Sequence, residues 1–356
     1  MELEQIRAEI DRIDHEIVER LNARIRLASQ VARAKSKTGA PIYVPSREEQ
    51  VFQKLAAINE GPLSENAIRS IYREIISAMI ALERQLVIAY LGPEATYTQQ
   101  AAIKNFGTSL SYHAMGTIAD VFTAVEQGEA DYGVIPIENS TGGAVFHSLD
   151  MFIDSELKIV SQVYLEIEHC LISHSKLPTI KKVVSKDQAL IQCRDWLARN
   201  LPQAELLDAE STAHAVQRAG DEPGVAAIAS ALAGELYRVP IQVHGIQDQR
   251  NNVTRFLVIG KAGSKKTGEG MDKTSIVVSI SDKVGALEKA LQPFSARGIN
   301  LTKIESRPSR RKAWDYVFFI DFIGHWDDPR VKETIAEVRE SCVMVKWLGS
   351  YPNTRL

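Results

Sequence analysis

The chain has 356 residues, of which 45% are hydrophobic and 24% charged, and its formal net charge is −3. This length favours two or three domains, and the near balance of charge excludes a general attraction to nucleic acid or to an anionic membrane. The charged N-terminus and the lack of a long apolar run predict neither a signal peptide nor a membrane span. Three widely spaced cysteines, Cys170, Cys193 and Cys342, predict free thiols of a cytoplasmic protein and no metal site.

Residues 1–86 predict an all-helical domain. No Gly or Pro interrupts residues 3–37, and apolar residues recur there at helical spacing, at Ile6, Ile10, Ile13, Ile17, Leu21, Ile25 and Ala28. We expect a second helix after Pro45, with Ser46 and Glu49 forming a capping box, and a third helix capped by Ser64.

Residues 87–260 alternate between short apolar strands and helices, which predicts an α/β domain with a largely parallel sheet. The predicted strands are 86–91, 132–137, 167–172, 182–185, 225–229, 241–244 and 255–259, and the predicted helices include 187–200 and 212–219. Residues 261–273 are rich in Gly, Lys and Ser and predict a flexible linker, because their glycines do not match a phosphate-binding loop. Residues 274–356 predict a β-α-β-β-α-β order, typical of an α+β ferredoxin-like domain.

Cations on the first helix are too far apart to meet within one chain. Arg24 and Lys35 share a helix face, whereas Arg7 lies about 25 Å before Arg24 at a rise of about 1.5 Å per residue. A second copy of the chain could bring its Arg7 to this face and complete a cationic pocket for a small dianion. Taken singly, each charge could equally be a solvated helix residue.

This helical segment resembles the helical chorismate mutases over residues 1–86. The matching positions are Arg7, Arg24, Lys35, Arg47, Glu48 and Glu83. The resemblance implies that arginines grip the substrate carboxylates and that Lys35 and Glu83 contact the ether oxygen. A Claisen rearrangement needs a substrate held in its reactive conformer and stabilisation of developing charge, which these side chains provide. Val44 replaces an Asp of some members, so we expect weaker binding of a substrate hydroxyl.

Hydroxyl and amide side chains gather at strand ends and helix starts of the α/β segment, where ligands of such sheets bind. They are Thr96, Glu138, Asn139, Ser140, Thr141, Ser185, Gln188, Gln192, Ser211, Thr212 and Thr254, the last followed by Arg255 and Phe256. Taken singly, Ser, Thr and Asn at such positions are more often caps and turns.

Taken together, these motifs resemble the prephenate dehydratases over residues 87–260. The resemblance rests mainly on Gly92–Thr96, Gly133–Thr141 and Asn252–Phe256. It implies a two-lobed fold like that of periplasmic binding proteins. It also implies that Thr254 donates to the leaving hydroxyl of prephenate, that Arg255 holds a carboxylate, and that no metal or organic cofactor takes part.

The C-terminal segment resembles the ACT domains that bind amino acids. Two motifs carry the resemblance, Gly285-Ala286-Leu287 and a stretch that contains Asn300, Leu301, Glu305, Ser306 and Arg307. The second motif is close to the phenylalanine-binding form, which implies that these residues bind L-phenylalanine. Val284 replaces the usual Pro before Gly285. A helix start and a strand-end turn would be the simpler explanation of the two motifs.

The order of the three segments resembles that of the bifunctional chorismate mutase–prephenate dehydratases. We therefore expect conversion of chorismate to prephenate and then to phenylpyruvate, inhibited by L-phenylalanine, in a homodimer or homotetramer without nucleic-acid or membrane partners. A mutase–prephenate dehydrogenase is the enzymatic alternative, but a dinucleotide fingerprint is absent from the sequence. A non-enzymatic amino-acid sensor is the second alternative.

Overall fold

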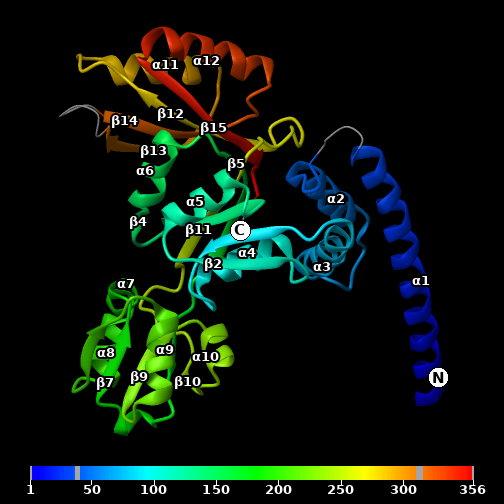
Figure 1. Ribbon diagram of the computed structural model, residues 1–356, viewed down its shortest axis with the longest axis vertical. Helices are drawn as coiled ribbons and strands as arrows, with labels where there is room; N and C mark the ends of the chain where they lie inside the picture. The colour runs from blue at the N-terminus through cyan, green and yellow to red at the C-terminus, as the bar shows by residue number, and fades with distance from the viewer. Residues whose placement is uncertain (1, 37–40, 310–315, 355–356) are drawn as a thin grey trace.

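The computed structural model describes residues 2–36, 41–309 and 316–354, with the side chains of residues 32–36 left aside. Figure 1 shows a helical part, two α/β lobes and a C-terminal sheet covered by two helices. No helix within the described ranges combines the length and apolar character that crossing a membrane requires.

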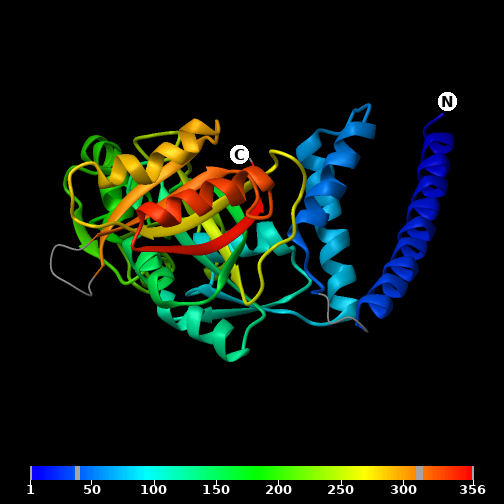
Figure 2. The same cartoon turned by 90° about the horizontal axis from the view of Figure 1, so that it is seen from above.

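The first helix, α1 (Leu3–Ser36), lies at the edge of the molecule, away from all three sheets (Figures 1 and 2). The N-terminal part of its predicted apolar stripe is uncovered, with Ile10 and Ile17 about half exposed, whereas Leu21, Ile25 and Ala28 are partly buried. The helix touches α3 (Glu65–Glu83) through Arg24, which contacts Tyr72 and Met79. An amphipathic helix normally buries such a stripe, so the fold leaves a surface suited to a partner.

Helix α2 (Pro45–Ile58) begins without the predicted capping box. Val44 is its N-cap and Pro45 its first residue, where the missing N–H of proline costs no hydrogen bond. Ser46 is buried, and Glu49 pairs with Arg69 of α3 at 2.8 Å. The predicted cap of α3 is confirmed, because the Ser64 side chain accepts a hydrogen bond from the backbone N–H of Ala67.

The α/β part contains two separate sheets, which confirms the predicted two-lobed architecture. The first has the order β2-β1-β3-β11-β5, with β4 beside β3, and the second has the order β10-β6-β9-β7-β8. The bounds of the first-sheet strands are β1 (Val87–Leu91), β2 (Ser111–Met115), β3 (Tyr132–Asn139), β4 (Gly143–Ala144), β5 (Lys158–Glu166) and β11 (Val253–Gly260). Those of the second sheet are β6 (Cys170–Ile172), β7 (Lys182–Ser185), β8 (Glu205–Asp208), β9 (Val225–Ala229) and β10 (Ile241–Val243).

Both sheets are mixed rather than largely parallel. Strands β1, β2 and β3 are parallel, as are β7, β8 and β9, but β11 runs antiparallel to both β3 and β5. The chain enters the second lobe after β5 and returns to the first through β11, so two connectors, residues 167–169 and 244–252, join the lobes.

Helices cover the faces of both sheets (Figure 1). They are α4 (Tyr97–Phe106), α5 (Ile118–Gln127), α6 (Phe146–Asp154), α7 (Asp187–Gln192), α8 (Arg194–Asn200), α9 (Thr212–Asp221) and α10 (Ala231–Tyr237), with a 3₁₀ turn at Leu177–Thr179. The single helix predicted over 187–200 is divided at Cys193, whose backbone leaves the helical region at φ −115° and ψ 12°.

The C-terminal part confirms the predicted ferredoxin-like order. Its elements are β12 (Asp272–Ser279), α11 (Ala286–Ala296), β13 (Leu301–Pro308), β14 (Tyr316–Ile323), α12 (Pro329–Ser341) and β15 (Met344–Pro352), and its sheet has the order β13-β14-β12-β15. Strand β15 packs on β5, where Gly349 approaches so closely that a Cβ would lie 2.2 Å from the Ile159 carbonyl oxygen. Phe319 and Leu348 of this sheet share one core with Phe152 of the first lobe.

The segment between β11 and β12, where a flexible linker is predicted, contacts its neighbours at two points, although most of its residues are exposed or only partly buried. Gly263 lies against the ring of Trp347. Thr267 is buried, and its hydroxyl donates to Asp272 at 2.6 Å, while its carbonyl accepts from Gln50 of α2 at 2.8 Å. Composition predicts flexibility, whereas Gly263 and Thr267 contact residues of β15, β12 and α2.

A buried ion cluster joins the C-terminal sheet to the first lobe. The Arg255 side chain of β11 is buried, and its guanidinium donates to Glu138 at 3.0 Å, to Asp321 at 2.7 Å and to the Tyr351 hydroxyl at 2.7 Å. Asp321 also accepts from Ser275 at 2.5 Å. Burial alone would raise the pKa of Asp321, but the charge of Arg255 and the hydrogen bonds outweigh it and lower that pKa.

Asp321→Asn is expected to destabilise the C-terminal part by about 3 kcal/mol at pH 7, because it leaves the buried Arg255 charge with one carboxylate fewer. Since the folded-state pKa of Asp321 is below its ordinary value of 3.8, this stabilisation is present above pH 3.8 and lost as the pH falls through the folded-state pKa. Urea unfolding followed by the fluorescence of the stacked Trp326 and Trp347 measures the effect.

Asp327→Asn is the matched control, because Asp327 forms an exposed pair with Lys332 and should change stability little. An equal effect of Asp321→Asn at pH 7 and at pH 3 would contradict this account of the cluster.

Candidate functional site

Thr254 lies on β11 directly opposite Asn139 on β3. The Asn139 amide donates to the Thr254 hydroxyl oxygen at 2.8 Å and to the Asn252 side-chain oxygen at 2.6 Å. Because the Thr254 oxygen accepts this bond, its own hydrogen is free to donate in another direction. Accepting a hydrogen bond also polarises the hydroxyl, which strengthens it as a donor. The pair thus forms an oriented hydrogen-bond donor at the end of a strand.

The side-chain oxygen of Asn139, Oδ1, accepts hydrogen bonds from the loop that follows β3. It accepts from the backbone N–H of Thr141 at 3.0 Å, from the Thr141 hydroxyl at 2.7 Å and from the N–H of Gly142 at 2.8 Å. The Ser140 hydroxyl donates to the Asn251 carbonyl at 3.0 Å. The predicted group Asn139, Ser140 and Thr141 is therefore gathered around Thr254 by the structure.

The second lobe reaches the same place through helix α7. The Gln192 amide donates to the Thr141 hydroxyl at 2.9 Å, and its oxygen accepts from Asn252 at 3.0 Å. Gln188 lies beside Gly142, where a Cβ would be only 2.5 Å from the Gln188 amide nitrogen. Both glutamines were predicted, and they bring the two lobes together over Thr254.

Two further residues of this network, His169 and Tyr97, were not predicted. His169 lies 2.8 Å from the Gln192 oxygen and 3.3 Å from the Tyr97 hydroxyl. Burial lowers the pKa of His169, so the ring is neutral at pH 7. A single histidine in a sequence is usually structural, and its position on the connector before β6 is visible only in the folded chain.

Five other predicted residues of this set lie in helix caps, at a helix start or in the core. Thr96 and Ser211 cap α4 and α9, the simpler alternative for such residues. Ser185 is buried and donates to the Ile228 carbonyl at 2.6 Å, and Phe256 is 2% exposed in the core of the first lobe. Thr212 follows the Ser211 cap as the first residue of α9.

Arg255 and Glu138 also differ from the prediction of substrate contact. The Arg255 guanidinium already holds two protein carboxylates, and Glu138 pairs with Arg255 and with Lys303 of β13. The side chains of Arg255 and Glu138 point toward the C-terminal sheet. Neighbouring residues of a strand face opposite sides of the sheet, so Thr254 faces away from the C-terminal sheet.

In the helical part, Arg24 and Arg47 line one open cavity of about 560 Å³, together with Lys54 and Tyr72. Lys54 was not predicted. Glu48 does not line this cavity, because it is 8% exposed and pairs with Arg73. Adjacent helix residues lie about 100° apart, so Glu48 faces the interior where Arg47 faces the cavity, and the predicted substrate contact of Glu48 stays a prediction.

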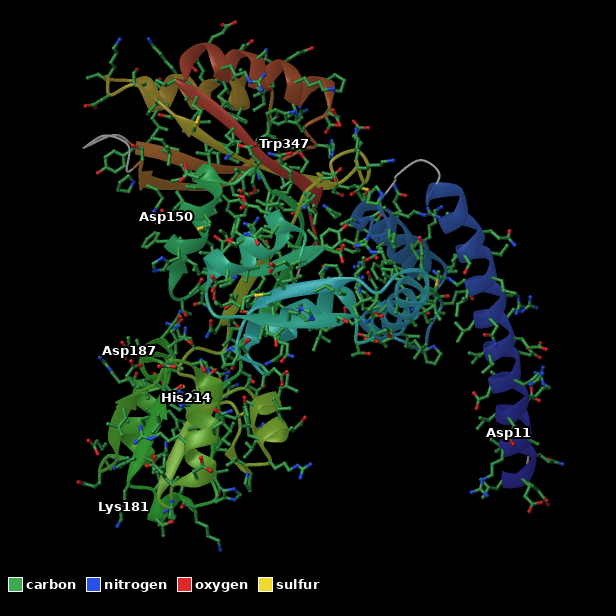
Figure 3. The ribbon with its side chains drawn as sticks, in the orientation of Figure 1. Asp11, Asp150, Lys181, Asp187, His214 and Trp347 are labelled. Atoms are coloured by element: carbon green, nitrogen blue, oxygen red, sulfur yellow. The ribbon has the colours of Figure 1, made fainter. Side chains whose placement is uncertain are left out.

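The remaining mutase residues lie apart from this cavity or outside the described side chains. Arg7 is exposed on α1, one turn from Asp11, which Figure 3 labels at the far end of that helix. Glu83 is the exposed last residue of α3, and Lys35 lies in the part of α1 whose side chains are not described.

The predicted effector residues fall into two groups. Gly285, Ala286 and Leu287 line a cavity of about 240 Å³ with Tyr316 and Phe318, and Gly285 adopts a left-handed φ of 78° that favours glycine. Asn300, Leu301, Glu305 and Ser306 do not line that cavity and lie before or along β13, an edge strand. Arg307 of β13 instead binds Asp150 of α6 at 2.9 Å (Figure 3 labels Asp150).

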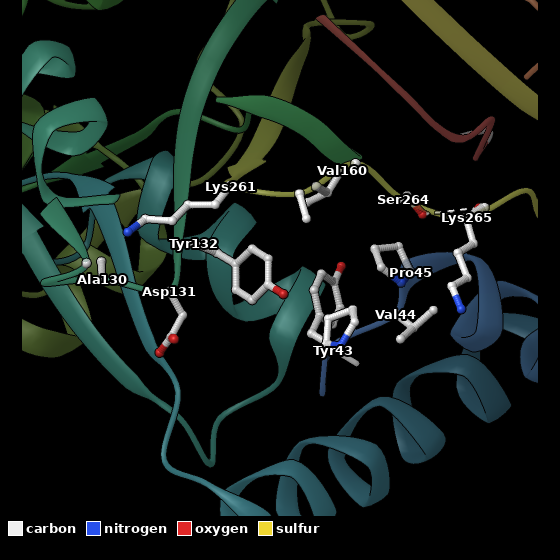
Figure 4. A pocket seen from close by; sticks show the side chains of 14 residues that line it. Tyr43, Val44, Pro45, Ala130, Asp131, Tyr132, Val160, Lys261, Ser264 and Lys265 are labelled. Atoms are coloured by element: carbon white, nitrogen blue, oxygen red, sulfur yellow. Dashed lines mark hydrogen bonds between the residues drawn. The ribbon is translucent and has the colours of Figure 1, made fainter. Parts of the chain in front are cut away.

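A separate cavity of about 340 Å³ lies where α2, β3 and the segment after β11 meet. Figure 4 shows Tyr43 and Tyr132 on its wall, with Lys261 and Lys265 nearby. It contains none of the predicted site residues.

Within the described residues, one set of side chains has metal-ligand types. Glu168 and His244 lie on the two connectors between the lobes and Cys170 begins β6, with their ligand atoms within 4.8 Å of one another. His244 is distant in sequence from Glu168 and Cys170, so no spacing pattern could indicate the set. Glu168 and His244 are more than half exposed and lie 3.7 Å apart.

Comparison with known proteins finds three family models that match successive parts of the chain. Residues 6–84 match the family model of chorismate mutase type II, residues 88–264 that of prephenate dehydratase, and residues 274–340 that of the ACT domain.

Whole-length relatives are similar to the chain from end to end. The bifunctional chorismate mutase/prephenate dehydratase of Aquifex aeolicus is 47% identical, over 100% of this chain and 99% of the relative. That of Pseudomonas aeruginosa is 42% identical, again over 100% and 99%. A crystal structure of the prephenate dehydratase of Arthrobacter aurescens in complex with L-Phe matches 75% of this chain and 90% of its own, with a TM-score of 0.71 and 31% identity. The chain therefore belongs to the family of bifunctional chorismate mutase/prephenate dehydratases, enzymes of phenylalanine biosynthesis with an ACT regulatory domain.

Proposed function

We propose that the two reactions take place at separate sites of this chain. Residues 1–86 form the mutase, residues 87–260 the dehydratase, and residues 274–356 the regulatory domain, joined by the segment 261–273. The observation that carries this division is the presence of two unconnected polar sites, the open arginine cavity of the helical part and the Asn139–Thr254 pair between the lobes.

In the mutase site, Arg24 and Arg47 bind the carboxylates of chorismate, because guanidinium groups pair with carboxylates through two parallel hydrogen bonds. Lys35 and Glu83 contact the ether oxygen, where charge develops in the transition state. Arg7 comes from a second copy of the chain, which also covers the exposed stripe of α1. Two observations support this assembly: the length of α1, 34 residues, and the absence of a cover over the N-terminal part of its apolar face within the described residues. A homodimer is thus the smallest complete mutase.

Arg7→Ala and Arg24→Ala subunits, each inactive as a mutase, should complement each other when mixed. In an equal mixture of symmetric dimers, half are heterodimers with one complete site of two, so about a quarter of the mutase activity should return. Dehydratase activity, which both variants keep, is the internal control. Absence of recovery after subunit exchange has been verified with differently tagged chains would show that each site is built within one chain.

In the dehydratase site, Thr254 donates a hydrogen bond to the hydroxyl group that leaves prephenate. The C–C bond to the departing carboxylate breaks, its electron pair moves into the ring, and the C–O bond to the hydroxyl breaks. Carbon dioxide leaves, the departing hydroxide takes up a proton from solvent to become water, and the ring becomes aromatic. A neutral hydroxyl suffices as donor, because aromatisation drives the step and little proton transfer is required. Asn139 orients Thr254, and Gln188 and Gln192 bring the second lobe over the substrate.

Thr254→Val keeps the shape of the side chain but removes the donor, and the dehydratase kcat should fall by about 10²- to 10³-fold. Thr254→Ser should retain much of the activity. The mutase activity of the same chains serves as a control for folding and should be unchanged. Parallel loss of both activities would indicate a folding defect and would contradict the assignment of Thr254 as the donor.

L-phenylalanine is the effector of the ACT domain in this proposal. The Arthrobacter aurescens relative is described as a complex with L-Phe. Since the Gly285–Leu287 cavity and the residues of β13 do not meet within one chain, a second ACT domain is needed to join them. The effector site then lies between two chains, as does the mutase site.

Neither reaction requires a cofactor, because one is a rearrangement and the other is driven by aromatisation. The three cysteines are free in the structure, and free thiols persist in reducing compartments. We infer a cytoplasmic location for the enzyme.

A further inference from the structure

A lysine of the ACT sheet touches the residue that precedes Asn139. The Lys303 ammonium group on β13 forms an ion pair with the Glu138 carboxylate, and the Lys303 side chain is only 12% exposed. Lys303 stands two residues before Glu305, in the strand that carries the predicted effector residues. No role in either reaction follows from the sequence motifs for Lys303.

The Lys303–Glu138 pair belongs to the buried ion cluster, which contains one sequence neighbour of Asn139 and one of Thr254. Glu138 precedes Asn139, and Arg255 follows Thr254, in register across β3 and β11. Glu138 is held by Lys303 and Arg255, while Arg255 is held by Asp321 and Tyr351 of the ACT sheet. The ACT domain therefore holds the side chains of Glu138 and Arg255, the register pair directly beside the 2.8 Å bond between Asn139 and Thr254.

A second contact fixes the other end of the same strand. Arg307 binds Asp150 of α6 with two nitrogens, and its guanidinium lies over the Phe146 ring at 4.3 Å. Strand β13 is thus attached to the first lobe at Lys303 and at Arg307. Movement of β13 relative to the lobe must alter at least one of these ion pairs.

We propose that Lys303 is a positioning residue of the dehydratase, which acts through Glu138 on Asn139 and Thr254, and that effector binding at β13 reaches the reaction through this ion pair. The inference rests on the proposed regulation by L-phenylalanine and names the contact that transmits it.

The charges of the cluster explain why one contact can have such an effect. Burial would raise the pKa of Glu138, but Arg255 and Lys303 outweigh it and lower that pKa, so the carboxylate is ionised at neutral pH. If Lys303 withdraws, Arg255 alone must serve both Glu138 and Asp321. Lys273 is buried nearby, and burial and the charge of Arg255 lower its pKa to about 8. Strand β13 can thus have Lys303 paired with Glu138 or withdrawn from it. An effector that binds one of these two arrangements more tightly shifts the population toward that arrangement.

Lys303→Met in the full-length enzyme removes the charge and keeps the length of the side chain. We expect the dehydratase kcat to fall about fivefold, with the KM for prephenate within about twofold of wild type, because Lys303 positions the donor and does not hold substrate. L-phenylalanine should still bind, as measured by calorimetry, but its effect on the dehydratase should weaken by about tenfold. Mutase activity should be unchanged, and Lys303→Arg should restore regulation.

Lys332→Met is the matched control in the same domain. Lys332 is exposed on α12 and pairs with Asp327 at 3.1 Å, away from the dehydratase lobe, so this variant should be inhibited as wild type is. Adding Lys303→Met to Glu138→Gln should change the response to phenylalanine no further than Glu138→Gln alone, because both changes break the same pair.

Three outcomes would overturn the inference. A Lys303→Met enzyme with the wild-type phenylalanine dependence would show that the signal takes another route, while the proposed regulation would stand. Loss of phenylalanine binding in this variant would make Lys303 an effector ligand and not a positioning residue. A wild-type dehydratase insensitive to phenylalanine would overturn the proposed regulation together with this inference.

Discussion

The buried guanidinium of Arg255 is the constraint on which the arrangement of the α/β and ACT parts depends. A charge that is 3% exposed is tolerated only with partners, and those partners come from two domains. Glu138 is supplied by the dehydratase sheet, whereas Asp321 and Tyr351 are supplied by the ACT sheet. Separation of the two sheets would therefore leave Arg255 partly unpaired, which opposes free movement of the ACT domain. The close approach of Gly349 to Ile159 adds a geometric constraint at the same contact.

The same constraint would connect the proposed regulation with the proposed role of Thr254. Thr254 and Arg255 are neighbours on one strand and face opposite sides, so one residue serves the cleft and the other the ACT domain. Catalysis needs a donor held in a fixed orientation before the substrate arrives. A regulatory domain that holds the adjacent residues can change that orientation without entering the cleft, and this separates the effector from the substrate in space.

Sequence patterns predicted the features that depend on neighbours in the chain. The bounds of β7 and β9 were predicted to the residue, and the Asn139–Thr141 group and Gln192 lie near Thr254. Strand β5 was missed because its run of five buried residues has no alternating pattern. Other features depend on contacts between distant segments, which no local pattern contains. They are the pairing of Glu48 with Arg73, the pairing of Arg255 with Asp321 and the contact of His169 with Gln192.

The mutase helices differ in how firmly they are attached to the remainder of the chain. Tyr43, just before α2, accepts a hydrogen bond from Asn105 of α4 at 2.8 Å, and Ser77 of α3 accepts from the backbone N–H of Ser109 at 3.1 Å. Gln50 of α2 reaches the segment before β12. Helix α1, by contrast, packs mainly against α3 within the described residues. The helices that present Arg47 and Glu83 are thus fixed to the dehydratase, while α1 can pair with a second chain without disturbing either α/β lobe. This attachment would let one chain join the proposed shared mutase site to a dehydratase site of its own.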